Sequence, residues 1–296
     1  MTAFPAKTRE FVNFVLDSRR WNGFQFRDDD IVISTWSKSG TTLTQQIVGQ
    51  LVFGGDPGVY GQSLSPWLDF RFIPAADVLA QADAQTHRRF LKTHLPVDAL
   101  VFSPKAKYIY VGRDARDVFW SWRHHHSIFS DAAYDIMNPP DRTWPEFQRP
   151  DPDVHRAYRR FLEDGHPVFP FWPHVQSWWD IRHLPNVMLI HFNELRADLG
   201  AAIARIATFL DIDLEDALAK AVAENCSIER MKKLAAEFEV LTLVFDGGGE
   251  NFINKGVNGR WKDVLTDEEV ALCDTVAAEN LTPDCAHWLA TGKMPS

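Results

Sequence analysis

One short polar segment, Lys38-Ser39-Gly40-Thr41-Thr42, has the residue types needed to bind a phosphate-like anion. It follows the apolar run 31–35 and begins a helix expected over residues 41–53. Backbone N–H groups at the start of such a helix, with a helix dipole of roughly half a positive charge, attract an anion. The hydroxyl side chains add donors and the lysine adds a positive charge. The alternative is a strand–helix turn that is only capped by one of these hydroxyls.

The order of residues in this loop differs from that of the common nucleotide-binding loop. In that loop the lysine follows the last glycine, as G-x-x-x-x-G-K-[ST]. Here Lys38 precedes Gly40. The sequence therefore favours an anion-binding loop but argues against an ATP-dependent kinase of the ordinary type.

Two further segments could bind a second phosphate. Arg113 follows the apolar run 108–111, and Ser121 lies about two helical turns later, so a guanidinium and a hydroxyl could meet on one anion. The segment 255–262 contains Gly256 and Gly259 among basic residues, which suits a loop around an anion. The alternatives are an ordinary helix start and a basic surface turn.

His94 follows the apolar run 89–93, which contains Lys92. A histidine at a strand end can act as a general base, although most histidines do not. The run His124-His125-His126 suggests a metal site, but consecutive side chains on a helix point in different directions. Because no H-E-x-x-H or paired-cysteine pattern occurs either, we predict no bound metal.

Apolar runs alternate with helical segments along the chain, which predicts an α/β fold of one domain over residues 1–296. The sheet should be mostly parallel and flanked by helices. Such sheets bind ligands beyond the carboxyl ends of their strands, where Lys38, His94 and Arg113 all fall. The predicted strands are 31–35, 89–93, 108–111 and 187–191, and the predicted helices are 12–20, 41–53, 115–126 and 198–210. The Pro-rich stretch 138–173 should be a long surface excursion that could act as a lid.

Composition narrows the function classes. The net charge of −9 makes nucleic acid an improbable partner. No apolar run reaches 18 residues, so no membrane span is predicted. The three cysteines are too few and too unpatterned for a disulfide framework, and the first twenty residues lack the apolar core of a signal peptide. Both observations favour a reduced, cytoplasmic protein.

These motifs, in this order, resemble those of the cytosolic-type sulfotransferases, which use 3′-phosphoadenosine 5′-phosphosulfate (PAPS) and release adenosine 3′,5′-bisphosphate (PAP). The similarity runs from about residue 20 to 270 and implies that family's P-loop-like fold. It also implies transfer of a sulfuryl group to an acceptor hydroxyl or amine. The segment 65–69 is similar to bacterial members described as glycolipid or aryl sulfotransferases.

The resemblance implies where the donor binds. The first loop would hold the 5′-phosphosulfate, and the segments around Arg113 and 255–262 would hold the 3′-phosphate. Several positions depart from the family pattern. Leu43 and Phe192 stand where a Trp and a Tyr usually meet the adenine, Cys226-Ser227 replaces a Thr-Ser pair near the base, Asn254 replaces an arginine, and Trp36-Ser37 replaces a Tyr-Pro pair. The implied donor-binding residues are Lys38, Ser39, Gly40, Thr41, Thr42, Leu43, Arg113, Ser121, Phe192, Cys226, Phe252, Asn254, Lys255 and Gly256.

The resemblance also implies catalytic roles. His94 would take the acceptor proton, Lys38 would stabilise the leaving group, and Lys92 would neutralise the sulfuryl oxygens. Ser121 would restrain Lys38 until the acceptor arrives. A non-catalytic nucleotide-binding protein of the same fold is the alternative, although it would be expected to lose Lys38 or His94.

The acceptor pocket should be aromatic, which favours a phenol, an alcohol or a lipid-like molecule. Only half of the family's dimerisation motif is present: Lys262 and Thr266 match, whereas Asp267 and Ala271 do not. A homodimer is possible, but the family's mode of dimerisation is not fully encoded. The candidate pocket residues, which could instead fill the core, are Trp36, Phe70, Phe72, Trp122, Phe129, Trp144 and Phe169.

Overall fold

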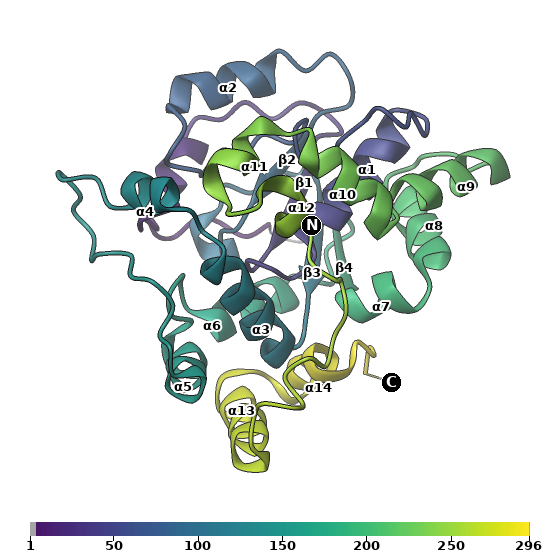
Figure 1. Cartoon of the computed structure of the whole chain (residues 1–296). Helices are drawn as coiled ribbons and strands as arrows, with labels where there is room; N and C mark the ends of the chain where they lie inside the picture. Colours follow the sequence, from purple (N-terminus) through teal and green to yellow (C-terminus); the bar gives the residue numbers. More distant parts are fainter. Residues whose placement is uncertain (1–3, 296) are drawn as a thin grey trace.

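A central parallel sheet organises the chain, as the computed structural model of residues 4–295 shows (Figure 1). The four strands lie in the order β2-β1-β3-β4. In the register, Ile31 of the second strand in that order pairs with Phe90 on one side and with Lys107 on the other. The predicted α/β fold with a parallel sheet is confirmed. The strands are β1 (Ile31–Thr35), β2 (Phe90–Thr93), β3 (Lys107–Gly112) and β4 (Val187–His191).

Helices cover both faces of the sheet. In Figure 1, α7 and α8 lie on one side of the strands, and α3 and α6 lie on the other. The helices are α1 (Thr41–Val52), α2 (Ala75–Asp83), α3 (Ala115–Ser127), α4 (Asp131–Met137), α5 (Val154–Asp164), α6 (Phe171–Asp180), α7 (Phe192–Ala197), α8 (Leu199–Phe209), α9 (Asp216–Asn225), α10 (Ile228–Ala236), α11 (Glu239–Val244), α12 (Gly248–Phe252), α13 (Asp267–Asn280) and α14 (Pro283–Thr291), with 3₁₀ helices at Ser18–Trp21 and Val97–Ala99.

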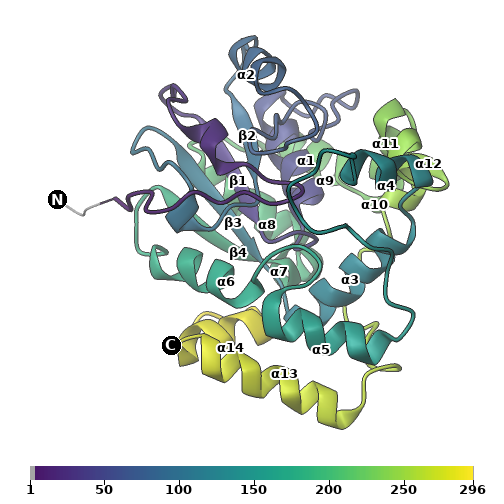
Figure 2. The ribbon, with the colours of Figure 1, turned by 90° about the vertical axis from the view of Figure 1, so that its left-hand side faces the viewer.

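The two faces of the sheet build two hydrophobic cores. Because successive side chains of a strand point to opposite faces, Val32 belongs to one core and Ile31 and Ile33 belong to the other. The first core also contains side chains of α3, α5, α6 and α14, and the second contains side chains of α1, α8 and α9. Burial on both faces explains why the strands read as continuous apolar runs in the sequence. Figure 2 shows α13 and α14 packed at one end, next to α5 and α6.

A buried ion pair joins the amino ends of β1 and β2. The Arg89 guanidinium donates from Nε to Oδ1 of Asp30 at 2.8 Å and from Nη2 to Oδ2 at 2.5 Å. Both side chains are almost wholly buried. The pair fixes the two strands at the edge opposite to the one where Lys38 and His94 follow.

The amino-terminal segment differs from the prediction. Residues 12–20 do not form a regular helix: they make isolated bridges between Val12 and Asp17 and between Leu16 and Phe70, followed by the 3₁₀ helix Ser18–Trp21. The Asn13 side chain accepts bonds from the backbone of residues 15 and 16, which competes with helical hydrogen bonds.

The stretch 138–173 is also more ordered than predicted. Only its first part is extended loop, because α5 occupies residues 154–164 and α6 begins at residue 171. Asp153 caps α5 through its carboxylate, which accepts from the backbone of His155 and Arg156. Tyr158 and Phe161 of α5 are wholly buried in the first core, so α5 is part of the packed fold. The predicted helix 198–210 is preceded by a separate short helix, α7.

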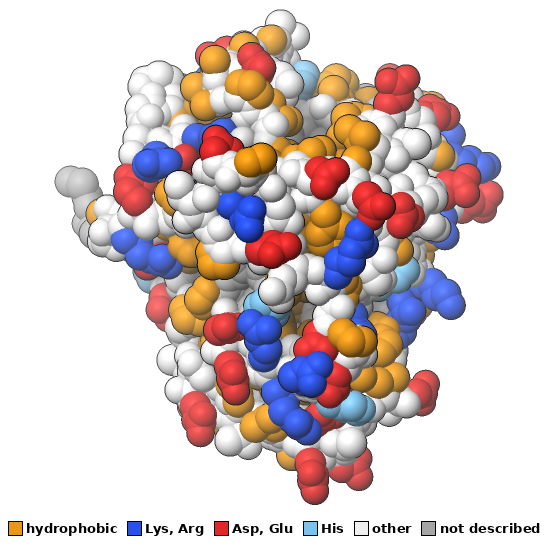
Figure 3. Space-filling view, turned by 60° about the vertical axis from the view of Figure 1, so that its left-hand side comes forward, with side chains coloured by type: hydrophobic (Ala, Val, Ile, Leu, Met, Phe, Trp, Pro, Cys, Tyr) orange, Lys and Arg blue, Asp and Glu red, His pale blue; other side chains and the backbone are white. Residues whose placement is uncertain are grey.

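Charge is distributed evenly over the face in Figure 3, where basic and acidic side chains are interspersed. Within residues 4–295, every helix is too short or too polar to cross a membrane.

Candidate functional site

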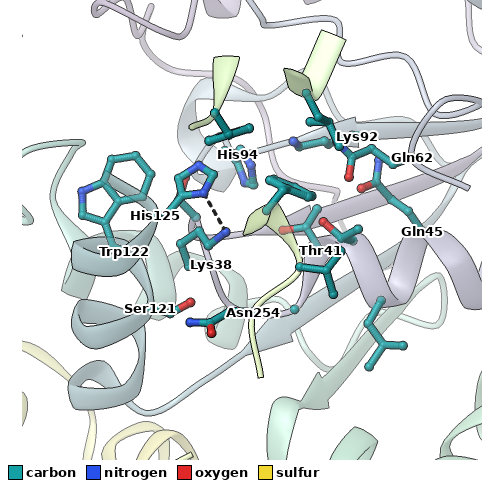
Figure 4. A pocket seen from close by; sticks show the side chains of 18 of the residues that line it. Lys38, Thr41, Gln45, Gln62, Lys92, His94, Ser121, Trp122, His125 and Asn254 are labelled. Carbon is teal, nitrogen blue, oxygen red and sulfur yellow. Dashed lines mark hydrogen bonds between the residues drawn. The ribbon is translucent and has the colours of Figure 1, made fainter. Parts of the chain in front are cut away.

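A cavity of about 880 Å³ lies beyond the carboxyl ends of β1, β2 and β3. It combines aromatic walls with basic side chains from each of these strand ends (Figure 4). Most of the predicted site residues line this one cavity: Lys38, Gly40, Thr41, Thr42, Leu43, Lys92, His94, Arg113, Ser121, Phe192, Cys226, Phe252, Asn254 and Gly256.

The loop between β1 and α1 has a backbone that few residues tolerate. Lys38 and Gly40 have φ values of +68° and +121°. A Cβ on Gly40 would come within 2.9 Å of the Phe192 ring, so only glycine fits there without movement. Gly40 is the N-cap of α1 and offers no side chain to the first amides of the helix. This arrangement suits an anion at the helix start.

The Lys38 ammonium lies inside the cavity next to His125. Its Nζ is 3.1 Å from Nδ1 of His125, and it lies 5.1 Å from the centroid of the Phe252 ring. Burial, and then the charges of Lys92 and Arg113, lower the pKa of Lys38 to about 7. Burial holds the pKa of His125 well below its ordinary value, so His125 is neutral and accepts from Lys38. Figure 4 shows this contact as a dashed line. No hydrogen bond joins Lys38 to Ser121 among the described residues, so the restraint of Lys38 by Ser121 stays a prediction.

His94 is oriented by the end of β1. Its Nδ1 donates to the carbonyl oxygen of Thr35 at 2.7 Å, which leaves Nε2 with a free lone pair. The hydroxyl of Thr35 also forms a hydrogen bond with the hydroxyl of Thr41 at 2.7 Å, so Thr35 connects His94 to the start of α1. Burial, and then the charge of Lys92, hold the pKa of His94 well below its ordinary value. The His94 imidazole is thus neutral near pH 7.

Lys92 lies on the opposite side of His94 from Lys38. Its Nζ is 3.7 Å from the centroid of the Trp67 ring, and the indole of Trp67 donates to Asp69 at 2.8 Å. Burial lowers the pKa of Lys92 to about 8, while the charge of Asp69 acts in the opposite direction. Lys92 therefore remains largely charged at pH 7 without an ion-pair partner among the described residues.

Arg113 connects the end of β3 to the carboxyl-terminal loop. Its Nε and Nη2 donate to Oδ1 of Asn258 at 3.0 and 2.7 Å, and Nη1 donates to the carbonyl oxygen of Lys38 at 2.9 Å. The guanidinium lies 4.3 Å from the centroid of the Phe192 ring. Burial lowers the pKa of Arg113 to about 10, so it is charged at pH 7. Segment 255–262 thus contacts Arg113 through Asn258; that the segment wraps an anion stays a prediction.

Two predicted donor-binding side chains do not enter the cavity. Ser39 is buried beneath the loop, and the Lys255 side chain is exposed outside the cavity. In that segment Gly256 and Arg260 line the cavity instead.

The aromatic candidates divide into two groups. Phe70, Phe72, Trp122 and Phe129 line the cavity as predicted. Trp36 is wholly buried and donates to the carbonyl oxygen of Phe169, so both fill the first core. Trp144 packs under the Arg71 guanidinium, 4.2 Å from its ring centroid, outside the cavity. Trp36, Trp144 and Phe169 therefore do not line the cavity as predicted: Trp36 and Phe169 are buried in the first core, and Trp144 is half-buried beside Arg71.

Among the cavity residues that the sequence interpretation missed are His125, Trp67 and Gln45. The signal for His125 was its spacing, since it lies four residues after Ser121 and therefore on the same helix face. The same spacing relates Gln45 to Thr41. Among residues 4–295, no group of three His, Cys, Asp or Glu side chains is arranged to hold a metal ion.

Comparison with known proteins gives consistent matches. The model of the sulfotransferase domain family matches residues 28–283. A glycolipid sulfotransferase of Mycobacterium bovis is 32% identical over 309 residues, covering 95% of this chain and 94% of the relative. Sulfotransferase 1B1 of Mus musculus is 28% identical and covers 91% of this chain and 88% of its own. The fold is similar to that of mouse sulfotransferase SULT7A1 complexed with PAP, with a TM-score of 0.70, 23% identity, and coverage of 91% of this chain and 90% of that chain.

Proposed function

Because the chain belongs to the sulfotransferase family and is a sulfotransferase enzyme, we propose that it uses PAPS as donor and transfers the sulfuryl group to an acceptor hydroxyl. The observation that carries the proposal is a cluster of three cations at three strand ends. Lys38, Lys92 and Arg113 line one cavity, and none of them forms an ion pair with a carboxylate among residues 4–295. Buried charges are normally paired, so the cluster fits a ligand with several anionic groups.

The residues present fit PAPS. The glycine-capped start of α1 and Lys38 would hold the 5′-phosphosulfate. Arg113 and Ser121 would hold the 3′-phosphate, with Asn254 and Gly256 beside them. Leu43, Phe192 and Cys226 would surround the adenine. The PAP in the complex of the mouse relative supports this assignment.

PAPS would supply an activated sulfuryl group whose transfer needs positioning and charge stabilisation, as phosphoryl transfer does. His94 would take the proton of the acceptor hydroxyl at Nε2, since Nδ1 is held by Thr35. The imidazolium formed would keep its orientation through the same bond.

The two lysines would stabilise negative charge. Lys38 would exchange His125 for the oxygen of the leaving group, and Lys92 would face the sulfuryl oxygens from the other side of His94. Preorganised charges of this kind act strongly where, as for both lysines, burial removes them from water.

The acceptor wall supports a molecule with an apolar part. Trp67, Phe70, Phe72, Trp122 and Phe129 line the cavity beyond His94. The relative from Mycobacterium bovis is called a glycolipid sulfotransferase, which supports a lipid-like acceptor here.

Ligand-induced thermal stabilisation tests the donor assignment. A ligand that binds only the folded state at 100 times its Kd stabilises it by about 2.7 kcal/mol. We expect PAP to raise the melting temperature by several degrees, while ATP with Mg²⁺ gives little change. Stabilisation by ATP–Mg²⁺ alone would indicate a kinase. No response to PAP would contradict the proposal.

A further inference from the structure

Gln45 and Gln62 line the cavity near Lys92 (Figure 4), and Ser65 lines the same cavity; these three polar residues are called the polar recess below. The exposed fraction of Gln45 is 1% and that of Ser65 is 5%. Among the described residues, neither the amide nitrogen nor the amide oxygen of Gln45 has a hydrogen-bond partner, and neither does the hydroxyl of Ser65. Buried polar groups are normally paired, so this recess requires a physical explanation.

Loose packing is not that explanation, because the neighbouring glutamines of α1 are fully bonded. Gln46 donates to the carbonyl oxygen of Val59 at 3.0 Å and accepts from the backbone of Gly61 at 2.9 Å. Gln50 donates to Asp56 at 2.9 Å and accepts from Asn225 at 2.8 Å. The chain therefore satisfies two buried amides of this helix and leaves the third one, which faces the cavity, unpaired.

The recess is also firmly built. A Cβ on Gly61 would overlap the carbonyl group of Gln45, so segment 59–63 lies directly against α1. Three residues after this segment, Pro66 accepts from the backbone of Lys92 at 2.9 Å, which ties the same loop to β2. The α1 backbone that carries Gln45 is thus packed against a loop that is itself bonded to the sheet.

The chemistry of an amide indicates what it binds. Gln45 offers two N–H donors and one oxygen acceptor. Sulfuryl and phosphate oxygens only accept, and they would leave the amide oxygen unpaired. A hydroxyl both donates and accepts, and two adjacent hydroxyls can satisfy both ends of the amide.

The position of the recess points to the acceptor. In Figure 4, Gln45 and Gln62 lie near Lys92, on the opposite side of the view from Ser121 and Asn254. From Trp67 the chain continues directly into the aromatic wall of Phe70 and Phe72. A molecule whose hydroxyl meets His94 could place a polar part in the recess and an apolar part along this wall.

We propose that the polar recess, with Gln45 at its centre, binds a second hydroxyl of the acceptor. The preferred acceptor class is then a polyhydroxylated group, such as a sugar ring with vicinal hydroxyls, joined to an apolar chain. The proposal rests on the function proposed above and adds a specificity-determining residue to it.

Two acceptors with the same apolar chain test the proposal: octyl β-glucoside and 1-octanol. We would measure kcat/KM for each, with PAPS as donor, from the sulfated product by mass spectrometry. We expect the wild type to prefer the glucoside. Gln45→Leu should lower kcat/KM for the glucoside at least 10-fold, because a site built for hydrogen bonds loses them. It should leave 1-octanol within about twofold.

The matched control is Gln81→Leu, which changes an exposed glutamine at the edge of the same cavity and should leave the ratio between the two acceptors unchanged. A second readout is stability without ligand. The melting temperature of Gln45→Leu should equal or exceed that of the wild type, since an unpaired buried amide is removed.

Three results would overturn the proposal. Equal losses of kcat/KM for both acceptors in Gln45→Leu would show a general structural effect. A kcat/KM for each acceptor equal to that of the wild type would show a recess filled only by solvent. No sulfation of the glucoside by the wild type would show that the recess does not bind sugars. If PAP still stabilises the protein in any of these cases, the proposed donor chemistry stands. If PAP does not, the proposed function has failed as well.

Discussion

At the scale of single residues, the orientation of His94 is the feature on which the proposed mechanism depends. The Thr35 carbonyl holds Nδ1, so Nε2 is available as the base. Because a positioned base contributes about 10²–10⁴-fold, His94→Ala should lower kcat by at least 100-fold. The affinity for PAP should stay within a few-fold, since His94 has no role in holding phosphate. Steady-state kinetics and calorimetric titration measure the two effects, and a kcat near that of the wild type would show that another group is the base.

His125 is a second residue with a specific expected effect. Lys38 has a pKa of about 7 in the unliganded protein, so kcat/KM for PAPS should fall as pH rises above about 7 and the lysine loses its charge. The neutral His125 ring stabilises the charged lysine through a hydrogen bond, worth about 1.5 kcal/mol or more to a charged group.

His125→Phe should therefore move the alkaline limb of the kcat/KM profile about one pH unit lower, since one pKa unit is about 1.4 kcal/mol. Lys38→Arg, which stays charged, should remove that limb. If the limb stays in place in His125→Phe, the contact does not control the charge of Lys38.

At the scale of elements, the Arg89–Asp30 pair anchors the amino ends of two central strands. Removal of one partner of a buried pair leaves an uncompensated charge, which costs about 3–5 kcal/mol. We expect Asp30→Asn to lower the free energy of unfolding by that amount in urea denaturation.

The control for this prediction is Asp28→Asn. Asp28 forms an exposed ion pair with Lys105 at 3.2 Å, and exposed pairs contribute about 0–1 kcal/mol. Similar losses in the free energy of unfolding for both variants would show that the buried pair contributes no more to stability than the exposed pair.

The elements also show what the sequence could predict. The strands were readable because both faces of the sheet are buried, which made Ile31–Thr35 and Val187–His191 continuous apolar runs. The positions of Lys38, His94 and Arg113 followed from the rule that sites lie at strand ends. In segment 138–173 the prediction of a surface loop rested on the many prolines, which flank α5, and the amphipathic pattern of α5 itself was not used.

Side-chain partners were harder to predict than elements. Nothing in the local sequence says that Trp36 turns into the core whereas Trp67 lines the cavity, because the choice depends on distant helices such as α5 and α6. For the same reason, the contact between Lys38 and His125, which are 87 residues apart, could not be read from the sequence.

At the scale of the whole molecule, the cation cluster couples binding to pH. Lys38 and Lys92 have lowered pKa values, about 7 and about 8, because the folded protein buries them without an anion. The unfolded chain keeps these protons up to about pH 10.4. The cost of burying the two charges is therefore largest below pH 7 and is relieved as pH rises, so these groups make unliganded stability increase between pH 7 and 10.

The affinity for PAP should change with pH in the opposite direction to this stability. An anion beside the lysines raises their pKa values, so binding at pH 8 should take up protons and weaken as pH rises. Calorimetric titrations in two buffers with different ionisation enthalpies would measure the uptake. The same titrations on Lys38→Met should show less uptake, whereas equal uptake in both proteins would assign it to other groups.

The position of the three cations at three different strand ends has a consequence for folding. Lys38, Lys92 and Arg113 meet only after β1, β2 and β3 have aligned in a parallel sheet, and each alignment closes a long crossover. Such non-local pairings form late and slowly. The ability to bind the donor should then return only in the last phase of refolding. PAP bound to the native state should slow unfolding and leave the folding rate unchanged.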